Sequence, residues 1–247
     1  MSVPCLFVAA HPDDELLAMS VPLVEHLAGG YDVHVLWLSR GTGSGVLDVL
    51  NGDAPNPSPW WGLPHSPLAE GYQPLTADTM GEARLLEAHA AVRVLAAGLP
   101  GSLSVHCADL PDGKVSQAAA VAAIRAVADQ VAPGGPVRLK THSWLVENHS
   151  DHLAAGKAAR QLKVDEPARF GDVRYYVESP CWSDSRLSQV SEGFDGPATA
   201  ELAARVRNAV RQYAVWAPDA GRFAIGYHSV ASMLDPLAAT PKSMVHP

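Results

Sequence analysis

The sequence is poor in features that mark several classes of protein, and each shortage excludes a class. Its three cysteines, Cys5, Cys107 and Cys181, are far apart and form no C-x-x-C pair, which argues against a disulfide scaffold or a zinc knuckle. Only 18 Lys and Arg oppose 26 Asp and Glu, without a basic cluster, so no nucleic-acid partner is expected. No apolar run approaches the ~20 residues that span a bilayer. No basic stretch precedes the first apolar residues, so no signal peptide is expected. We therefore expect a cytoplasmic protein.

Short apolar runs alternate with segments whose apolar residues have helical spacing. Expected strands cover 3–10, 32–38, 104–108, 137–141 and 173–178, and expected helices cover 13–28, 82–97, 118–131, 150–162 and 199–216. Such alternation is typical of a mostly parallel sheet with helices on both faces. The sequence therefore predicts a three-layer, Rossmann-like α/β fold in one domain over residues 1–247. In this fold class ligands bind at the carboxyl ends of the strands.

Residues 41–81 interrupt this alternation with glycines, prolines and a Trp60–Trp61 pair. Long irregular segments in compact domains are usually functional or disordered, and paired tryptophans favour an ordered lip over a pocket. We expect this insertion and the C-terminal segment 179–247 to shape the substrate side. One of Trp60 and Trp61 is expected to contact substrate, and the alternative that both only pack beneath the loop stays open.

The motif AHPDDE follows the first expected strand directly. It places His11, Asp13 and Asp14 at one strand end. Either carboxylate could cap the following helix, but capping needs one carboxylate and no histidine. Two adjacent carboxylates repel each other unless a cation or a hydrogen-bond donor accepts them, so the motif favours a metal site or a catalytic role.

A second motif, His149-Ser150-Asp151-His152, follows another strand and begins a helix. Each histidine alone could be a surface residue, and Ser150 could cap the helix. Together the two motifs supply the mixed nitrogen and oxygen ligands of a catalytic zinc, with one position open for water.

Three other interpretations leave residues unexplained. The H-x-H-x-D-H motif of metallo-β-lactamase-fold hydrolases would need a histidine where Glu147 stands, and would leave the first motif unused. The segment 41–46 is similar to a dinucleotide-binding loop, but Val46 stands where its third glycine belongs. No G-x-S-x-G elbow for a serine nucleophile is present.

AHPDDE after an apolar strand, with H-x-D-H roughly 135 residues later, resembles the PIG-L/LmbE-like zinc N-deacetylases. This family includes deacetylases of N-acetylglucosaminyl-phosphatidylinositol, of the mycothiol and bacillithiol pathways, and of glycopeptide antibiotic pathways. The resemblance covers about residues 3–178. It implies a Zn²⁺ ion held by His11, Asp14 and His152, with Asp151 orienting a histidine from behind.

The resemblance also implies roles for five further residues. Asp13 would be the general base, and His149 would assist the oxyanion and the leaving amine. Arg84 matches the R-x-x-E helix whose arginine faces the sugar in some members. Asp112 lies in the family's substrate-side Asp-Gly turn, and Arg40 lies at its T-x-G-E turn.

Two departures from the family pattern affect the substrate rather than the reaction. Thr42 stands where the T-x-G-E motif has its glutamate, and neither Val146 nor Glu147 supplies the aromatic residue of sugar-specific members. The leading prediction is a zinc-dependent N-deacetylase of an N-acetylated amino sugar, in an antibiotic or other small-molecule pathway. An amidase for a larger amide, such as a mycothiol S-conjugate, and a catalytically dead sugar-binding protein are the alternatives. The oligomeric state stays open.

Overall fold

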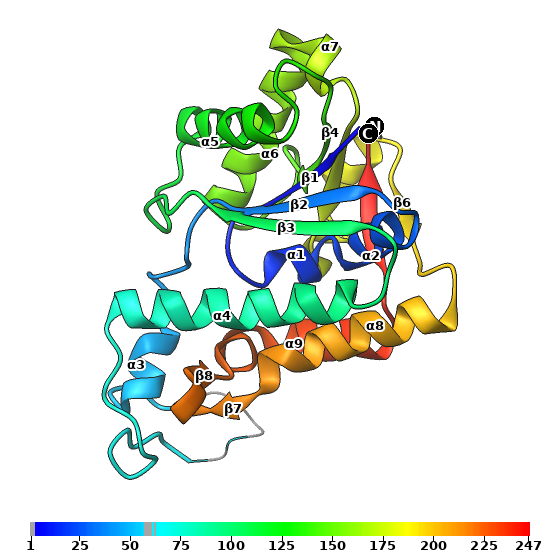
Figure 1. Ribbon diagram of the computed structural model, residues 1–247. Helices are drawn as coiled ribbons and strands as arrows, with labels where there is room; N and C mark the ends of the chain where they lie inside the picture. Colours follow the sequence, from blue (N-terminus) through cyan, green and yellow to red (C-terminus); the bar gives the residue numbers. More distant parts are fainter. Residues whose placement is uncertain (1–2, 57–60, 62) are drawn as a thin grey trace.

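A seven-stranded sheet forms the centre of the protein in the computed structural model, which describes residues 3–56, 61 and 63–247 (Figure 1). Across the sheet the strands are β3 (Ser102–Cys107), β2 (Asp32–Trp37), β1 (Cys5–Ala9), β4 (Arg138–His142), β5 (Val173–Val177), β9 (Ser243–His246) and β6 (Gly193–Asp195). The first five pair in parallel, and β9 is antiparallel to both of its neighbours. This mostly parallel sheet confirms the predicted fold class.

Helices cover both faces of the sheet (Figure 1). On one face lie α5 (Gln117–Val131), α6 (Ser150–Asp165) and α7 (Pro167–Phe170), and on the other lie α1 (Asp14–Leu17), α2 (Ser20–Ala28), α4 (Ala77–Ala96), α8 (Ala200–Val210) and α9 (Ile225–Ala239). Strand β1 serves both layers, because successive side chains of a strand point to opposite faces. Leu6 and Val8 pack in the core with α5 and α6, whereas Phe7 and Ala9 pack in the core with α2 and α4. Over the described residues, no helix is long and apolar enough to cross a bilayer.

The single helix expected at 13–28 is wrong, because α1 ends at Leu17 and α2 begins at Ser20. Pro22 explains the break. In an uninterrupted helix its ring would clash with the carbonyl of Ala18, and its missing N–H would leave that carbonyl without a partner. In the observed structure Pro22 falls in the first turn of α2, where a helix tolerates proline.

The segment 41–81 is partly helical. It contains α3 (Val46–Asn51), and α4 begins at Ala77, earlier than the expected position 82. Thr76 caps α4 with a reciprocal pair of hydrogen bonds. The Thr79 N–H donates to Thr76 Oγ1 at 3.2 Å, and the Thr76 N–H donates to Thr79 Oγ1 at 2.8 Å. This capping box fixes the start of α4.

The C-terminal segment departs most from the expectation. The helix expected to reach Trp216 ends at Val210, and Trp216 begins β7 (Trp216–Ala217), which pairs with β8 (Arg222–Phe223). Helix α9 and strands β6 and β9 were not expected. Buried Glu87 of α4 fastens this segment, because its carboxylate accepts the N–H groups of Phe223, Ile225 and Gly226 at 3.0–3.2 Å. The C-terminal segment is therefore attached to the face of the sheet that α4 covers.

Candidate active site

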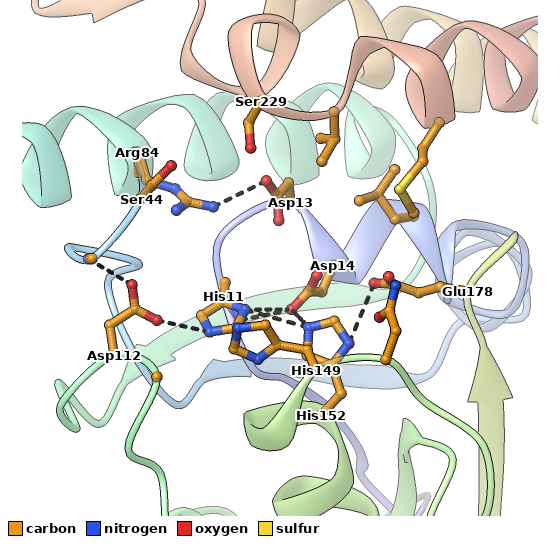
Figure 2. Close-up of a pocket in the computed structure, with 16 residues that line it drawn as sticks. His11, Asp13, Asp14, Ser44, Arg84, Asp112, His149, His152, Glu178 and Ser229 are labelled. Atoms are coloured by element: carbon orange, nitrogen blue, oxygen red, sulfur yellow. Dashed lines mark hydrogen bonds and ion pairs between the residues drawn. The ribbon is translucent and has the colours of Figure 1, made fainter. Parts of the chain in front are cut away.

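A polar cavity of about 360 Å³ lies at the carboxyl ends of the parallel strands (Figure 2). The turn after β1 and the start of α6 supply its floor, and the loop after β2 together with α4 and α9 supplies its opposite side. Strand ends of this kind gather side chains from distant parts of a chain. Seven of the predicted site residues line the cavity, namely His11, Asp13, Asp14, Arg84, Asp112, His149 and His152.

Three donor atoms on the floor form a nearly equilateral triangle. His11 Nδ1 and Asp14 Oδ2 are 3.4 Å apart, His152 Nε2 and Asp14 Oδ2 are 3.3 Å apart, and the two ring nitrogens are 3.4 Å apart. Ligands bound tetrahedrally to zinc at 2.0–2.1 Å lie about 3.3–3.4 Å from one another. The three side chains therefore fit a zinc ion without rearrangement.

The second ring nitrogen of each of these histidines faces a carboxylate. His11 Nε2 lies 2.9 Å from Asp112 Oδ1 and 3.2 Å from Asp151 Oδ2, and His152 Nδ1 lies 3.3 Å from Glu147 Oε2. A carboxylate at that nitrogen keeps a proton there and leaves the other nitrogen unprotonated. His11 Nδ1 and His152 Nε2 are therefore the nitrogens available for a metal.

His149 and His142 lie near enough to be considered as ligands, but their tautomers oppose it. The N–H of Asp151 donates to His149 Nδ1 at 3.2 Å, and the N–H of Ala10 donates to His142 Nε2 at 3.3 Å. Each neutral ring must then carry its proton on the other nitrogen. His149 consequently presents an N–H donor at Nε2 rather than a lone pair.

The buried carboxylates favour a cation at the centre of the triangle. Burial opposes ionisation of Asp14, but the charge of His152 and a hydrogen bond from His11 hold its pKa well below the usual range. Burial also opposes a charged His11, yet its hydrogen bonds to Asp112, Asp14 and Asp151 raise its pKa to about 11. Without a metal, protons on the rings supply the positive charge that this site needs.

Asp13 lies beside the triangle and has a different environment. It is buried, with the positive φ of 131° that non-glycine residues rarely adopt. Such strain is typical of functional sites. Burial raises the pKa of Asp13 to about 6, and the nearby Arg84 opposes this rise. Its Oδ2 accepts a hydrogen bond from Arg84 Nη2 at 3.0 Å, as Figure 2 shows.

The guanidinium of Arg84 forms hydrogen bonds with other groups of the protein. Besides Asp13, it donates to the carbonyls of Gly41 at 2.9 Å and Pro12 at 3.1 Å. Gly41 has a φ of 69°, and a Cβ there would collide with the guanidinium. Arg84 therefore lines the cavity while it joins the turn after β1 to the loop after β2.

Two other predicted residues, Asp151 and Arg40, do not line the cavity. Asp151 is buried behind His11 and accepts the N–H groups of Gly113 and Val115 at 2.8 and 3.1 Å. Arg40 pairs with Asp109 and Asp78 and does not line the cavity.

Trp61 also lies away from the cavity. Its ring stacks on His65, with centroids 4.8 Å apart, and tilts against Trp216 at 4.5 Å. Trp60 falls outside the described residues.

Two buried residues near the triangle, Glu147 and Glu178, were not assigned to the site from the sequence. Glu178 follows β5 and lines the cavity, and burial raises its pKa well above the usual range. The signal that could have found Glu178 is its position at the end of a strand. Glu147 lies in a loop, and no spacing rule points from it to His152.

The chain matches a known protein family. The family model described as PIG-L, GlcNAc-PI de-N-acetylase, matches residues 6–163. No curated protein matches the chain in a sequence search.

Several solved structures share the fold. The zinc-inhibited form of teicoplanin deacetylase Orf2 aligns with a TM-score of 0.63 at 15% identity, covering 99% of this chain and 97% of that one. N,N′-diacetylchitobiose deacetylase from Pyrococcus horikoshii gives 0.52 at 12% identity, covering 85% and 68%. The 4-carboxy-2-hydroxymuconate hydratase GalB from Pseudomonas putida KT2440 gives 0.57 at 15% identity, covering 99% and 95%. At these identities the likeness shows a common fold.

Proposed function

Because the chain belongs to the GlcNAc-PI de-N-acetylase (PIG-L) family, we propose that it is a zinc-dependent N-deacetylase of a small molecule that contains an amino sugar. The observation that carries the proposal is the triangle of His11 Nδ1, Asp14 Oδ2 and His152 Nε2, with edges of 3.3–3.4 Å. These three residues would hold the ion. When bound, zinc supplies a Lewis acid that makes water more acidic and polarises an amide carbonyl.

Asp13 is the base in this proposal. It lines the same cavity as the triangle, and Arg84 holds its carboxylate in place. As water attacks the acetamide carbon, Asp13 accepts the proton that the water loses. The C–N bond then breaks, the amine takes up a proton, and acetate leaves.

His149 stabilises the carbonyl oxygen as negative charge develops on it. Its Nδ1 accepts the N–H of Asp151, so Nε2 carries the proton and can donate it in a hydrogen bond. A donor fixed in advance costs no reorganisation when the charge appears. His149 stands at the N-terminus of α6. The positive end of the helix dipole therefore also stabilises negative charge on the carbonyl oxygen.

The solved neighbours include deacetylases of the teicoplanin pathway and a chitobiose deacetylase. They support an N-acetylated amino sugar as the substrate, and they favour a secondary-metabolite pathway over a thiol-cofactor pathway. Cleavage of a larger amide, such as a mycothiol S-conjugate, is the second candidate. The hydratase GalB has the same fold, so the reaction itself must be measured.

The test is to measure acetate release from N-acetylglucosamine glycosides and from thiol conjugates, with the metal content determined on the same samples. We expect one zinc per chain, loss of acetate release after chelation, and recovery when zinc is returned. The variants His11→Ala, Asp14→Ala and His152→Ala should each bind well under one zinc per chain. Acetate release that survives complete removal of metal would contradict the proposal.

A further inference from the structure

A second cavity of about 390 Å³ adjoins the candidate active site. The two cavities share Leu17 and Met233 in their walls. Helix α9 runs along both. Ser229, Val230 and Met233 face the first cavity, and Met233, Pro236 and Leu237 face the second. The wall of the second cavity extends about 10 Å along α9 from Met233 to Thr240, at 1.5 Å per helical residue.

The second cavity is mainly apolar. Aliphatic surface comes from Leu17, Met233, Pro236, Leu237 and Ala239, and Trp182 adds an indole ring. The Trp182 Nε1–H donates to the carbonyl of Val177 at 2.8 Å, so this ring is held in place. A cavity of this volume with apolar walls is typical of a small-molecule site.

One cation lies at the edge of the second cavity. Lys242 Nζ stands 4.6 Å from the ring centroid of Trp182 and 4.7 Å from that of Phe194. Among the described residues, no carboxylate lies within 4.0 Å of this ammonium. Its charge is partly balanced by the two aromatic faces, and it remains able to attract an anion.

We propose that the second cavity binds the apolar substituent of the same substrate, and that this substituent carries a negative charge at its far end. The inference rests on the proposed function, since it places the acetylated sugar in the first cavity. The shared wall of Leu17 and Met233 favours one ligand that occupies both cavities. The substrate class is then an N-acetyl amino sugar bearing an anionic apolar group of about six carbons.

The test measures binding without turnover. Methyl, hexyl and 5-carboxypentyl glycosides of glucosamine lack the acetyl group, and calorimetry gives their Kd for the zinc-loaded protein. We expect the hexyl glycoside to bind about 30-fold more tightly than the methyl glycoside, because the added methylene groups leave water. The carboxyl group should add about threefold.

Two variants and a matched control locate the effect. Ala239→Phe fills the second cavity from an exposed position and should remove the advantage of the hexyl chain. Ser232→Phe adds the same bulk on α9 outside that cavity and should keep the advantage. Lys242→Met should remove only the preference for the carboxylated chain.

Equal Kd values for the methyl and hexyl glycosides would overturn the inference. A hexyl advantage that survives Ala239→Phe would also overturn it, because the chain would then bind elsewhere. The N-acetyl forms of the glycosides separate the two proposals. Release of acetate with no effect of the chain contradicts the inference alone, and chain-dependent binding with no acetate release contradicts the proposed function alone.

Discussion

Asp13 and Asp14 are neighbours in the sequence, yet their carboxylates meet different groups. Asp14 Oδ2 faces the ring nitrogens of His11 and His152, and it accepts a hydrogen bond from the backbone N–H of His11 at 2.7 Å. Asp13 faces Arg84. The backbone of Asp13 has a positive φ of 131°, a strained conformation for a residue other than glycine. One carboxylate is therefore suited to bind a metal, while the other is suited to accept a proton.

The first prediction concerns Asp13. Asp13→Asn removes the base but leaves the three donor atoms in place, so kcat should fall roughly 10²–10⁴-fold with little change in KM. Zinc content should stay near one per chain. Steady-state kinetics and metal analysis give both values, and Asp14→Asn is the matched control, expected to lose zinc. If Asp13→Asn loses zinc as readily as Asp14→Asn, the division of roles is wrong.

A second prediction concerns Glu147, which contacts His152 from behind the triangle. Glu147→Ala removes the acceptor that holds the proton on His152 Nδ1, so zinc affinity should fall about 10–100-fold. Glu147→Gln keeps an oxygen acceptor and should recover part of this loss. Competition with a zinc chelator measures both affinities. Equal affinity in the wild type and both variants would show that Glu147 does not position His152.

At this scale the sequence was informative where chemistry follows a strand directly. The first motif, with His11, Asp13 and Asp14, comes directly after β1. His149 and His152 lie at the start of a helix that follows another strand. Their meeting at one edge of the sheet could therefore be predicted. Whether each residue acts as assigned stays a prediction. Glu147 could not be found, because its contact with His152 depends on the path of a loop. No periodic pattern in the sequence predicts the path of this loop.

Among the elements, the parallel strands and most of the long helices were predicted, whereas α9 and the short strands β6 and β9 were not. Strands β1, β2, β4 and β5 are buried runs that the sequence makes evident. Strands β6 and β9 have only three and four residues. They join the sheet through antiparallel pairing with partners that are distant in the sequence, and no local sequence pattern indicates such pairing.

The loop around Trp61 gives an element-scale prediction. Trp61 packs on His65 and Trp216, and His65 Nε2 lies 2.7 Å from His228 Nε2 of α9. Trp61→Ala should remove part of this packing and lower the free energy of unfolding by about 2 kcal/mol. KM should stay unchanged.

Thermal unfolding and steady-state kinetics check this prediction together. Leu63→Ala, in the same loop but 71% exposed, is the control and should shift Tm little. A raised KM at unchanged Tm would instead assign Trp61 to substrate contact, as the sequence first suggested.

For the whole molecule, Glu87 links α4 to the C-terminal segment and makes stability depend on pH. Burial raises its pKa to about 7, against the hydrogen bonds from Ile225 and Gly226 that oppose the rise. The folded carboxyl thus holds its proton to a higher pH than the unfolded one. Its contribution to the free energy of unfolding is greatest below pH 4.5 and should fall by about 3 kcal/mol as the pH rises through 7.

Glu87→Gln lacks this ionisation and provides the comparison. Chemical denaturation of both proteins between pH 4.5 and 8 gives the difference between their free energies of unfolding. This difference should change by about 3 kcal/mol, because the wild type becomes less stable relative to the variant as the pH rises. Two parallel curves would contradict the raised pKa. The one-domain organisation over residues 1–247 stays a prediction that the cooperativity of the same unfolding curves addresses.

The link between Glu87 and the C-terminal segment also has a consequence for the order of events during synthesis. The N–H of Phe223 lies 136 residues after the carboxylate that accepts it. At about 5–20 residues per second on the ribosome, that separation leaves Glu87 without these partners for roughly 7–27 seconds. During that interval the face of α4 that will be covered by α9 is open to water, to chaperones and to other nascent chains. Translation speed over residues 88–223 should therefore influence the yield of folded protein more than speed over the preceding residues.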